Sequence, residues 1–369
     1  MTVRLDEPQD KRLRAQRLRS HRLISPMASP SAAAGHMLAV QSQDFWAGRW
    51  AIAIRTKGHP NITAIDRSFN RGHLVRSWTM RGTIHTVRAE DLRWVLSVTG
   101  ERQEWQRQAF LRSLAISTEQ LDTAAQITCE TLATKRRLTR SQLVALFEEN
   151  GLDCTGLRGN AYLQALSIRG IVAQGPVVPR RDGITREQYF VLTDTLDGPS
   201  RPTPDPLGEM FIRYAIGHGP VTVDDFAWWS GLPKSHAHEA ASRIDERLKA
   251  VRIDGVLSYL SSRLPTPTVN APAAVLPAFD EYFLGYKDRS LSCPPRHQPR
   301  VGPLQNGIVR PMILAHGQVV GTWNHSRSVA GINNPPETEY FDDIAAEDTT
   351  DAEVNAALDR YLAFIRTAT

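Results

Sequence analysis

The feature that most constrains the fold is an order of elements that recurs along the chain, in which two short helices precede a hairpin. In the first copy, apolar residues predict helices in 37–54 and 62–71. Strand-like residues then fill 74–87 around Arg81-Gly82, a pair suited to a reversal of the chain. The segment 11–23 precedes this copy, and its leucines among arginines predict a surface-covering helix with a basic outer side.

The same order returns twice, although the letters themselves do not repeat. In the second copy, helices in 138–147 and 159–169 precede strands at 171–173 and 189–192, which flank an Asp182-Gly183 reversal. The third copy has helices in 207–217, 221–229 and 235–248 and strands in 251–253 and 255–260. Because helices followed by a hairpin are the order of a winged-helix unit, the chain is predicted to hold three such units in tandem.

The sequence beyond residue 264 has a different residue pattern. Four prolines between 265 and 277 break helices, and 309–314 and 318–323 alternate around His316-Gly317. A small β-rich domain is therefore expected, closed by a helix in 351–365. The predicted domains of this α+β architecture are 1–112, 113–200, 201–264 and 265–369.

Charge is distributed unevenly. Residues 1–112 contain 19 Lys and Arg against 9 Asp and Glu, whereas residues 331–369 contain 9 acidic residues against 2 basic ones. An arginine-rich surface gains free energy from counterion release on a polyanion such as duplex DNA, although a merely solvated basic surface fits the charge count equally well. The chain has no apolar run long enough for a membrane span and no signal core, so a cytoplasmic protein without a membrane partner is expected. A monomer is also expected.

Several classes of site lack their sequence basis. The three cysteines lie far apart without Cys-x-x-Cys spacing, which supports neither a disulfide framework nor a zinc site. No phosphate-binding glycine loop, Gly-x-Ser-x-Gly elbow or His-Glu-x-x-His motif occurs. His236 and His238 are two residues apart, which points their rings to different faces of a helix. No metal or cofactor is therefore expected.

A pair of adjacent acids, Asp280-Glu281, is flanked by aromatic residues. Burial there would raise the pKa of one carboxyl group and suit it to acid–base chemistry. The alternative is a structural acid whose hydrogen bonds are satisfied near the end of a strand, and the sequence favours this alternative.

The most distinctive segment is 38–50, where Gln41-Ser42-Gln43 is followed by aromatic residues and Arg49. Three further segments stand in a fixed order with it: Met80-Arg81-Gly82-Thr83-Ile84-His85 before Glu90-Asp91-Leu92, 276–289, and 309–323. In this ordered set the chain resembles the AlkZ/YcaQ-like winged-helix DNA glycosylases over nearly its whole length. The Gln-x-Gln motif is that of the AlkZ-type members, since the YcaQ-type members have an Asp at the position of Gln43.

This resemblance implies three tandem winged-helix units and a C-terminal β-barrel-like domain in a C-shaped cradle around duplex DNA. It also implies a DNA N-glycosylase that acts on bulky crosslinks, in a group associated with self-resistance to azinomycin-like alkylating products. The catalytic candidates are Gln41 and Gln43. An alkylated N7 places a positive charge on the purine, which then departs as a neutral base, so neutral amides that hold a water suffice for the reaction.

Basic side chains at the tips of the predicted hairpins and in the 293–303 loop are candidates for contacts with phosphates or grooves. The nominated residues are Arg81, Arg180, Arg181, Arg296 and His297. A rival hypothesis is a non-catalytic DNA-binding protein, either a transcriptional regulator or a drug-sequestering resistance factor. Such a regulator usually dimerises, and the sequence shows no heptad seam for that.

Overall fold

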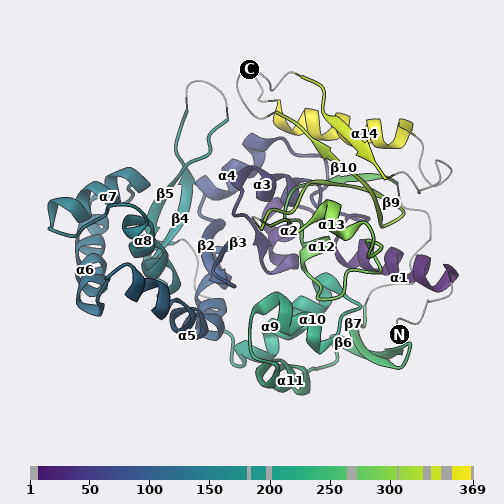
Figure 1. Ribbon diagram of the computed structural model, residues 1–369, viewed down its shortest axis with the longest axis horizontal. Helices are drawn as coiled ribbons and strands as arrows, with labels where there is room; N and C mark the ends of the chain where they lie inside the picture. The colour runs from purple at the N-terminus through teal and green to yellow at the C-terminus, as the bar shows by residue number, and fades with distance from the viewer. Residues whose placement is uncertain are drawn as a thin grey trace. The chain divides into compact units, whose positions relative to one another are not determined.

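The computed structural model describes residues 7–180, 184–196, 202–263, 272–305, 307–326, 334–341 and 351–366 (Figure 1). The chain divides into two compact units, each discontinuous in sequence. Unit 1 comprises Met1–Ile65, Leu207–Trp229 and Pro233–Thr369, and unit 2 comprises Asp66–Pro206 and Ser230–Leu232. The division into four domains stays a prediction.

Unit 1 is built from helices around two small sheets. Its helices are α1 (Glu7–Ser20), α2 (Pro30–Met37), α3 (Phe45–Ala53), α9 (Pro206–His218), α10 (Val223–Ser230), α11 (Lys234–Ser242), α12 (Glu281–Leu284), α13 (Gln298–Val301) and α14 (Asp351–Ile365). Its strands are β1 (Val40–Gln41), β6 (Leu248–Ile253), β7 (Val256–Ser261), β8 (Ala274–Leu276), β9 (Met312–Ala315), β10 (Gln318–Asn324) and β11 (Glu337–Tyr340).

The C-terminal strands form an antiparallel sheet in the order β11-β10-β9-β8. The turn between β9 and β10 is the predicted one, because His316 (φ 47°) and Gly317 (φ 79°) both adopt the left-handed conformation of a tight hairpin. A barrel requires its first and last strands to pair. Among the described residues β8 and β11 are instead the edges of an open sheet, and α14 packs against β8, so the barrel-like expectation is wrong.

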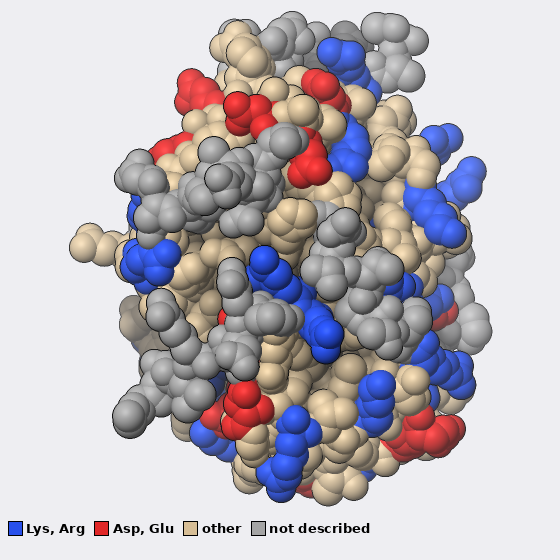
Figure 2. All heavy atoms as spheres, turned by 90° about the vertical axis from the view of Figure 1, so that its right-hand side faces the viewer, with Lys and Arg blue, Asp and Glu red and all other residues tan. Residues whose placement is uncertain are grey.

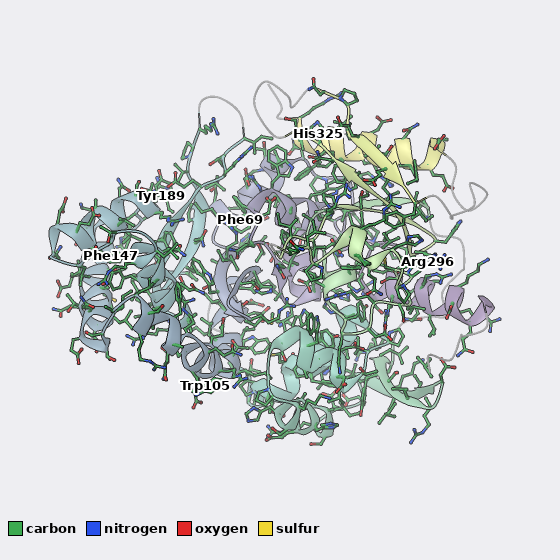
Figure 3. All side chains as sticks on the ribbon, in the orientation of Figure 1. Phe69, Trp105, Phe147, Tyr189, Arg296 and His325 are labelled. Carbon is green, nitrogen blue, oxygen red and sulfur yellow. The ribbon has the colours of Figure 1, made fainter. Side chains whose placement is uncertain are left out.

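Unit 2 joins a helical layer to an antiparallel sheet. Its elements are β2 (Leu74–Met80), β3 (Thr83–Arg88), α5 (Ala89–Ser113), α6 (Thr118–Lys135), α7 (Arg140–Glu149), α8 (Arg158–Ile168), β4 (Val172–Val177), β5 (Gln188–Leu192) and the short 3-10 helix η1 (Thr193–Thr195). The strands β3, β2, β4 and β5 are antiparallel neighbours in that order. Phe147, labelled in Figure 3, lies in the core between these helices and the sheet.

Local signals explain where these helices begin. The side chains of Ser117 and Thr139 each accept a hydrogen bond from the backbone N–H of the third residue of the helix that follows. That residue is a glutamine in both helices, and its side chain accepts the backbone N–H of the cap residue. Both α6 and α7 therefore begin with a capping box. Helix α4 (Ile62–Asn70) spans the division between the units. The three predicted hairpins are confirmed as β2–β3, β4–β5 and β6–β7. The winged-helix arrangement itself stays a prediction.

Three helix predictions need correction. The segment 37–54 is not one helix, because β1 and a short loop separate α2 from α3. The helix predicted over 235–248 ends at Ser242. The first helix ends at Ser20, and its basic residues do not simply face outward: Arg14 and Arg17 are each only 8% exposed. The guanidinium of Arg17 lies 3.7 Å from the centre of the Tyr286 ring, so burial is made possible by an aromatic partner.

Candidate active site

The Gln41-Ser42-Gln43 segment links the end of β1 to the start of α3. Asp44 caps α3, and its carboxylate accepts the backbone N–H groups of Trp46 at 2.9 Å and Ala47 at 3.2 Å. Gln43, just before this cap, is exposed, whereas Gln41 is 8% exposed. One amide therefore reaches solvent and the other lies at the margin of the protein interior.

Ser42, between the two glutamines, fixes the course of the chain. Its side chain is buried, and its hydroxyl donates to the carbonyl oxygen of Val40 at 2.9 Å. A Cβ added to Gly48 would lie 2.1 Å from Oγ of Ser42, so only glycine leaves room for the loop to pack against α3. The main chain between the two amides is thus held by close packing on one side.

The adjacent acids Asp280 and Glu281, both 1% exposed, tie this segment to α12. Asp280 forms a two-pronged ion pair with Arg55, with N–O distances of 2.7 and 2.9 Å, and also caps α12 by accepting the N–H of Tyr282. Arg55 follows α3, so this pair anchors the far end of that helix. The contacts of Asp280 support the interpretation that this acid has a structural role.

Glu281 anchors the other end of this stretch, at Gln41 before α3. One carboxylate oxygen accepts the backbone N–H of Gln41 at 2.8 Å, and the other accepts the indole N–H of Trp229 at 2.9 Å. Nε2 of His218 lies 3.6 Å from the second oxygen. Two consecutive acids therefore hold both ends of the stretch from Gln41 to Arg55.

A buried cluster of histidines and tyrosines lies behind Glu281. Nε2 of His21 is 2.8 Å from the Tyr286 hydroxyl, which donates to the carbonyl oxygen of His218 at 2.5 Å. Burial, with a further contribution from neighbouring His218, lowers the pKa of His21 well below its usual value. Burial likewise lowers the pKa of His36, on α2, to about 4. Both rings are therefore neutral at pH 7.

Two tryptophans of α3 fasten the helix to the C-terminal part of unit 1. The indole of Trp46 donates to the hydroxyl of Tyr361 on α14 at 3.1 Å, and that of Trp50 donates to the carbonyl oxygen of Val275 on β8 at 2.8 Å. The glutamine segment thus stands on a helix that is fixed at its start, along its length and at its end. Such a site can hold a small polar reactant in a set position.

The comparisons with known proteins agree with one another. A family model described as "DNA glycosylase AlkZ-like" matches residues 34–364 of the chain. The chain belongs to the AlkZ-like DNA glycosylase family. It is 25% identical over 341 residues, 86% of its own length and 88% of the relative's, to "Interstrand DNA cross-link repair glycosylase" from Streptomyces sahachiroi. The solved structure of "Streptomyces sahachiroi DNA glycosylase AlkZ" shares its fold, with a TM-score of 0.77 and 21% identity over 96% of this chain and 97% of that one.

The DNA contacts nominated in unit 1 of this AlkZ-like glycosylase differ in accessibility. Arg296 is exposed on the segment before α13 (Figure 3). His297 is 6% exposed, and its ring stacks on that of Phe341 with centroids 4.4 Å apart. Burial by this stacking partner removes His297 from the surface, so the expectation that it meets DNA is not supported.

Of the arginines nominated in unit 2, Arg81 lies at a hairpin tip. Arg81 (φ 55°) and Gly82 (φ 66°) form the β2–β3 turn, and the Arg81 side chain, half-buried, approaches Nε2 of His85 at 3.4 Å. Arg180 follows β4 and is exposed. Arg181 and the Asp182-Gly183 reversal lie outside the described residues.

The distribution of charge can be followed on one face of the molecule. The face drawn in Figure 2 shows Lys and Arg side chains dispersed between separate groups of Asp and Glu. Part of the basic excess of the N-terminal third is internal, since the following arginines are buried: Arg14, Arg17, Arg49, Arg55 and Arg76. Within the described residues no group of three or more potential metal ligands occurs, and no helix is long and apolar enough to cross a bilayer.

Sequence reasoning missed two residues of the site. It weighed Glu281 as half of an acid pair but gave it no partner, because Gln41 is 240 positions away in the chain. Trp229 lies 52 positions from Glu281, and nothing local shows that its indole meets a carboxylate. The one local signal was the aromatic surroundings of Asp280-Glu281, which indicated burial.

Proposed function

We propose that the protein is a monofunctional DNA glycosylase that hydrolyses the N-glycosidic bond of N7-alkylated purines, with Gln41 and Gln43 as its catalytic residues. The observation that carries this proposal is the placement of the motif: Gln43 is exposed and Gln41 lies beside it on a loop held by buried contacts. The family, and a relative named for crosslink repair, give the reaction class.

The chemistry requires little of the protein. Alkylation of N7 places a positive charge on the purine, so the electron pair of the breaking bond neutralises the base as it leaves. The sugar becomes an oxocarbenium-like cation, and water adds to C1′ and releases its proton to solvent. Amide oxygens that face C1′ stabilise this cation and orient the water, but a neutral amide does not take up the proton of the water as a carboxylate would. The reaction is therefore expected to fail on unmodified bases.

Crosslinked DNA sets a further condition. A base tied to the opposite strand cannot be flipped into a deep pocket in the ordinary way. An exposed amide at a helix start suits this substrate, since the protein can bring the residue to the sugar. We therefore extend the proposal to interstrand crosslinks of an azinomycin-like compound, with Arg81, Arg180 and Arg296 as contacts to the DNA backbone.

The test is release of 7-methylguanine from alkylated duplex DNA by the Gln41→Ala, Gln43→Ala double variant. We expect release to fall at least a hundredfold while DNA affinity changes less than about threefold. The exposed Gln106→Ala substitution on α5 is the matched control and should leave both unchanged. Unchanged base release by the double variant would remove the two amides from the mechanism.

A crosslinked oligonucleotide separates this function from its rival. A glycosylase leaves an abasic site, which alkali cleaves into a shorter strand. A transcriptional regulator or sequestering protein would leave the crosslink intact, and a regulator would bind a particular undamaged sequence with much higher affinity than other sequences.

A further inference from the structure

Among the described residues, Glu281 faces polar groups from separate parts of unit 1. They are the backbone N–H of Gln41 at the end of β1, the indole N–H of Trp229 on α10, and Nε2 of His218 at the end of α9. The carboxylate is 1% exposed, so water does not substitute for a lost partner. Its contacts therefore fix the position of β1 relative to α9, α10 and α12.

Both N–H partners of Glu281 can only donate. A carboxylate offers two acceptor oxygens in one plane and serves both donors at once. A glutamine at this position would offer one acceptor oxygen and one NH₂ group, so one of the two donors would face another donor. The geometry thus explains why the position holds a charged acid although burial of a charge is costly.

The ring of His218 is fixed beside the Glu281 carboxylate by its other contacts. Its Nδ1 lies 3.1 Å from the carbonyl oxygen of Tyr214, which can only accept, so Nδ1 carries a proton. Its Nε2 has no hydrogen-bond partner among the described residues. A Cβ on Gly285 would lie 2.7 Å from Cδ2 of His218, so close packing keeps the ring against the start of α12.

We propose that Glu281 is a positioning residue for the glycosylase motif. By holding the N–H of Gln41 while Trp229 holds its other oxygen, it sets the direction in which the Gln41 side chain leaves the main chain. Displacement of a reacting group by about 1 Å costs up to a hundredfold in rate, so loss of this bond lowers catalysis more than it lowers DNA binding. This inference rests on the proposed function of Gln41.

The decisive experiment is a double-mutant cycle with Glu281→Gln and Trp229→Phe. Glu281→Gln leaves one N–H unsatisfied, so we expect the single-turnover rate of 7-methylguanine release to fall about tenfold or more. Trp229→Phe removes the indole donor but keeps an aromatic ring, and a smaller loss is expected. In the double variant the glutamine oxygen can accept from Gln41 while its NH₂ group donates to Nε2 of His218. The double variant should therefore be faster than Glu281→Gln alone.

The controls separate positioning from stability. Each variant is assayed well below its melting temperature, and its DNA affinity is measured by fluorescence anisotropy and should stay within about twofold. Glu246→Gln, an exposed acid of unit 1, should match the wild type. A wild-type rate for Glu281→Gln under these conditions, or a double variant no faster than Glu281→Gln, would overturn the positioning role.

Hydrogen exchange at the backbone amide of Gln41 gives a readout that does not depend on activity. Glu281→Gln should speed exchange in a peptide that spans Val40 to Gln43, and the double variant should slow it again. If the wild-type protein released no base, the proposed function would fail, yet this measurement would still decide whether Glu281 holds Gln41. Unaltered exchange in Glu281→Gln would reject the inference itself.

Discussion

The loop that bears the two glutamines and the hairpin tips that bear the arginines are both proposed to meet DNA, yet they are held in different ways. The loop is fixed by side chains from distant parts of the chain: Glu281 binds Gln41, and Asp280 binds Arg55 beyond α3. The backbone of the β2–β3 tip is held by its own turn and by the side chains of Gln103 and Gln164, which contact Gly82 at 3.3 and 3.4 Å. The arginine side chains are held less firmly, since Arg81 is half-buried beside His85 and Arg180 stands exposed after β4.

This difference matches the different precision that the two tasks require. A group that stabilises developing charge at one atom must be held within a fraction of an ångström. A phosphate contact acts through longer-range charge and tolerates movement. We therefore expect substitutions around the loop to change stability and rate strongly, and substitutions at the tips to change affinity mildly.

The largest effect should come from breaking the buried ion pair. Asp280→Asn leaves the guanidinium of Arg55 buried without its counter-charge, which should cost on the order of 3–5 kcal/mol of unfolding free energy. Chemical denaturation measures this loss. Asp288→Asn, an exposed acid of the same segment, is the control and should cost less than about 0.5 kcal/mol. A loss for Asp280→Asn as small as that of the control would show that the pair does not anchor α3.

The next largest effect is expected from Gly48→Ala, which tests how the loop packs against α3. Gly48→Ala places a methyl group where Oγ of Ser42 lies, so we expect a loss of about 2–3 kcal/mol and a slower release of base. Ser42→Gly in the same chain clears the space and should recover part of both. Gly100→Ala, in the middle of α5 with an ordinary contact of 3.4 Å, should be neutral or slightly stabilising. A fully stable Gly48→Ala variant would mean that the loop is free to move.

Protonation offers a third way to weaken the region behind the loop. Because the pKa of His36 is lowered to about 4, the unfolded chain takes up a proton below about pH 6.5 that the folded chain refuses. Stability should therefore fall as the pH drops from 7 toward 4, by about 2–3 kcal/mol for this group. His21, whose pKa is lowered in the same direction, adds to the fall.

Substitution identifies the source of that pH dependence. His36→Gln should flatten the dependence of the unfolding free energy on pH, whereas the exposed His236→Gln should leave it unchanged. If the unfolding free energy of His36→Gln fell with pH as steeply as that of the wild type, His36 would take no part in the pH dependence.

Local signals were sufficient to predict much of the fold. The turn at Arg81-Gly82 and the apolar spacing in 138–147 predicted β2–β3 and α7 because the residues responsible are neighbours in sequence. The closing helix α14 was predicted at its observed bounds. The long helices α5 and α6 received no prediction, since much of their length is polar and exposed.

The other features of the fold and of the site depend on contacts between residues that are far apart in the sequence. The burial of Arg17 depends on Tyr286, and the role of Glu281 depends on Gln41, pairs that no local pattern connects. Likewise β1 is only two residues long, so a helix across 37–54 was the better fit to the apolar spacing. The motif itself was found, whereas the residues that hold it were visible only in three dimensions.

The smallest effect should come from the hairpin tips, where Arg180→Ala removes one exposed charge. One lost phosphate contact weakens DNA binding by about threefold near physiological salt and reduces the slope of log affinity against log salt by about one. The single-turnover rate at saturating protein should not change, since the loop around Gln41 is untouched. Titrations of alkylated and unmodified duplex at three salt concentrations measure this, and both duplexes should lose affinity equally. If Arg180→Ala instead slowed base release at saturation, the tips would share in catalysis, and the contrast between a precise loop and tolerant tips would be false.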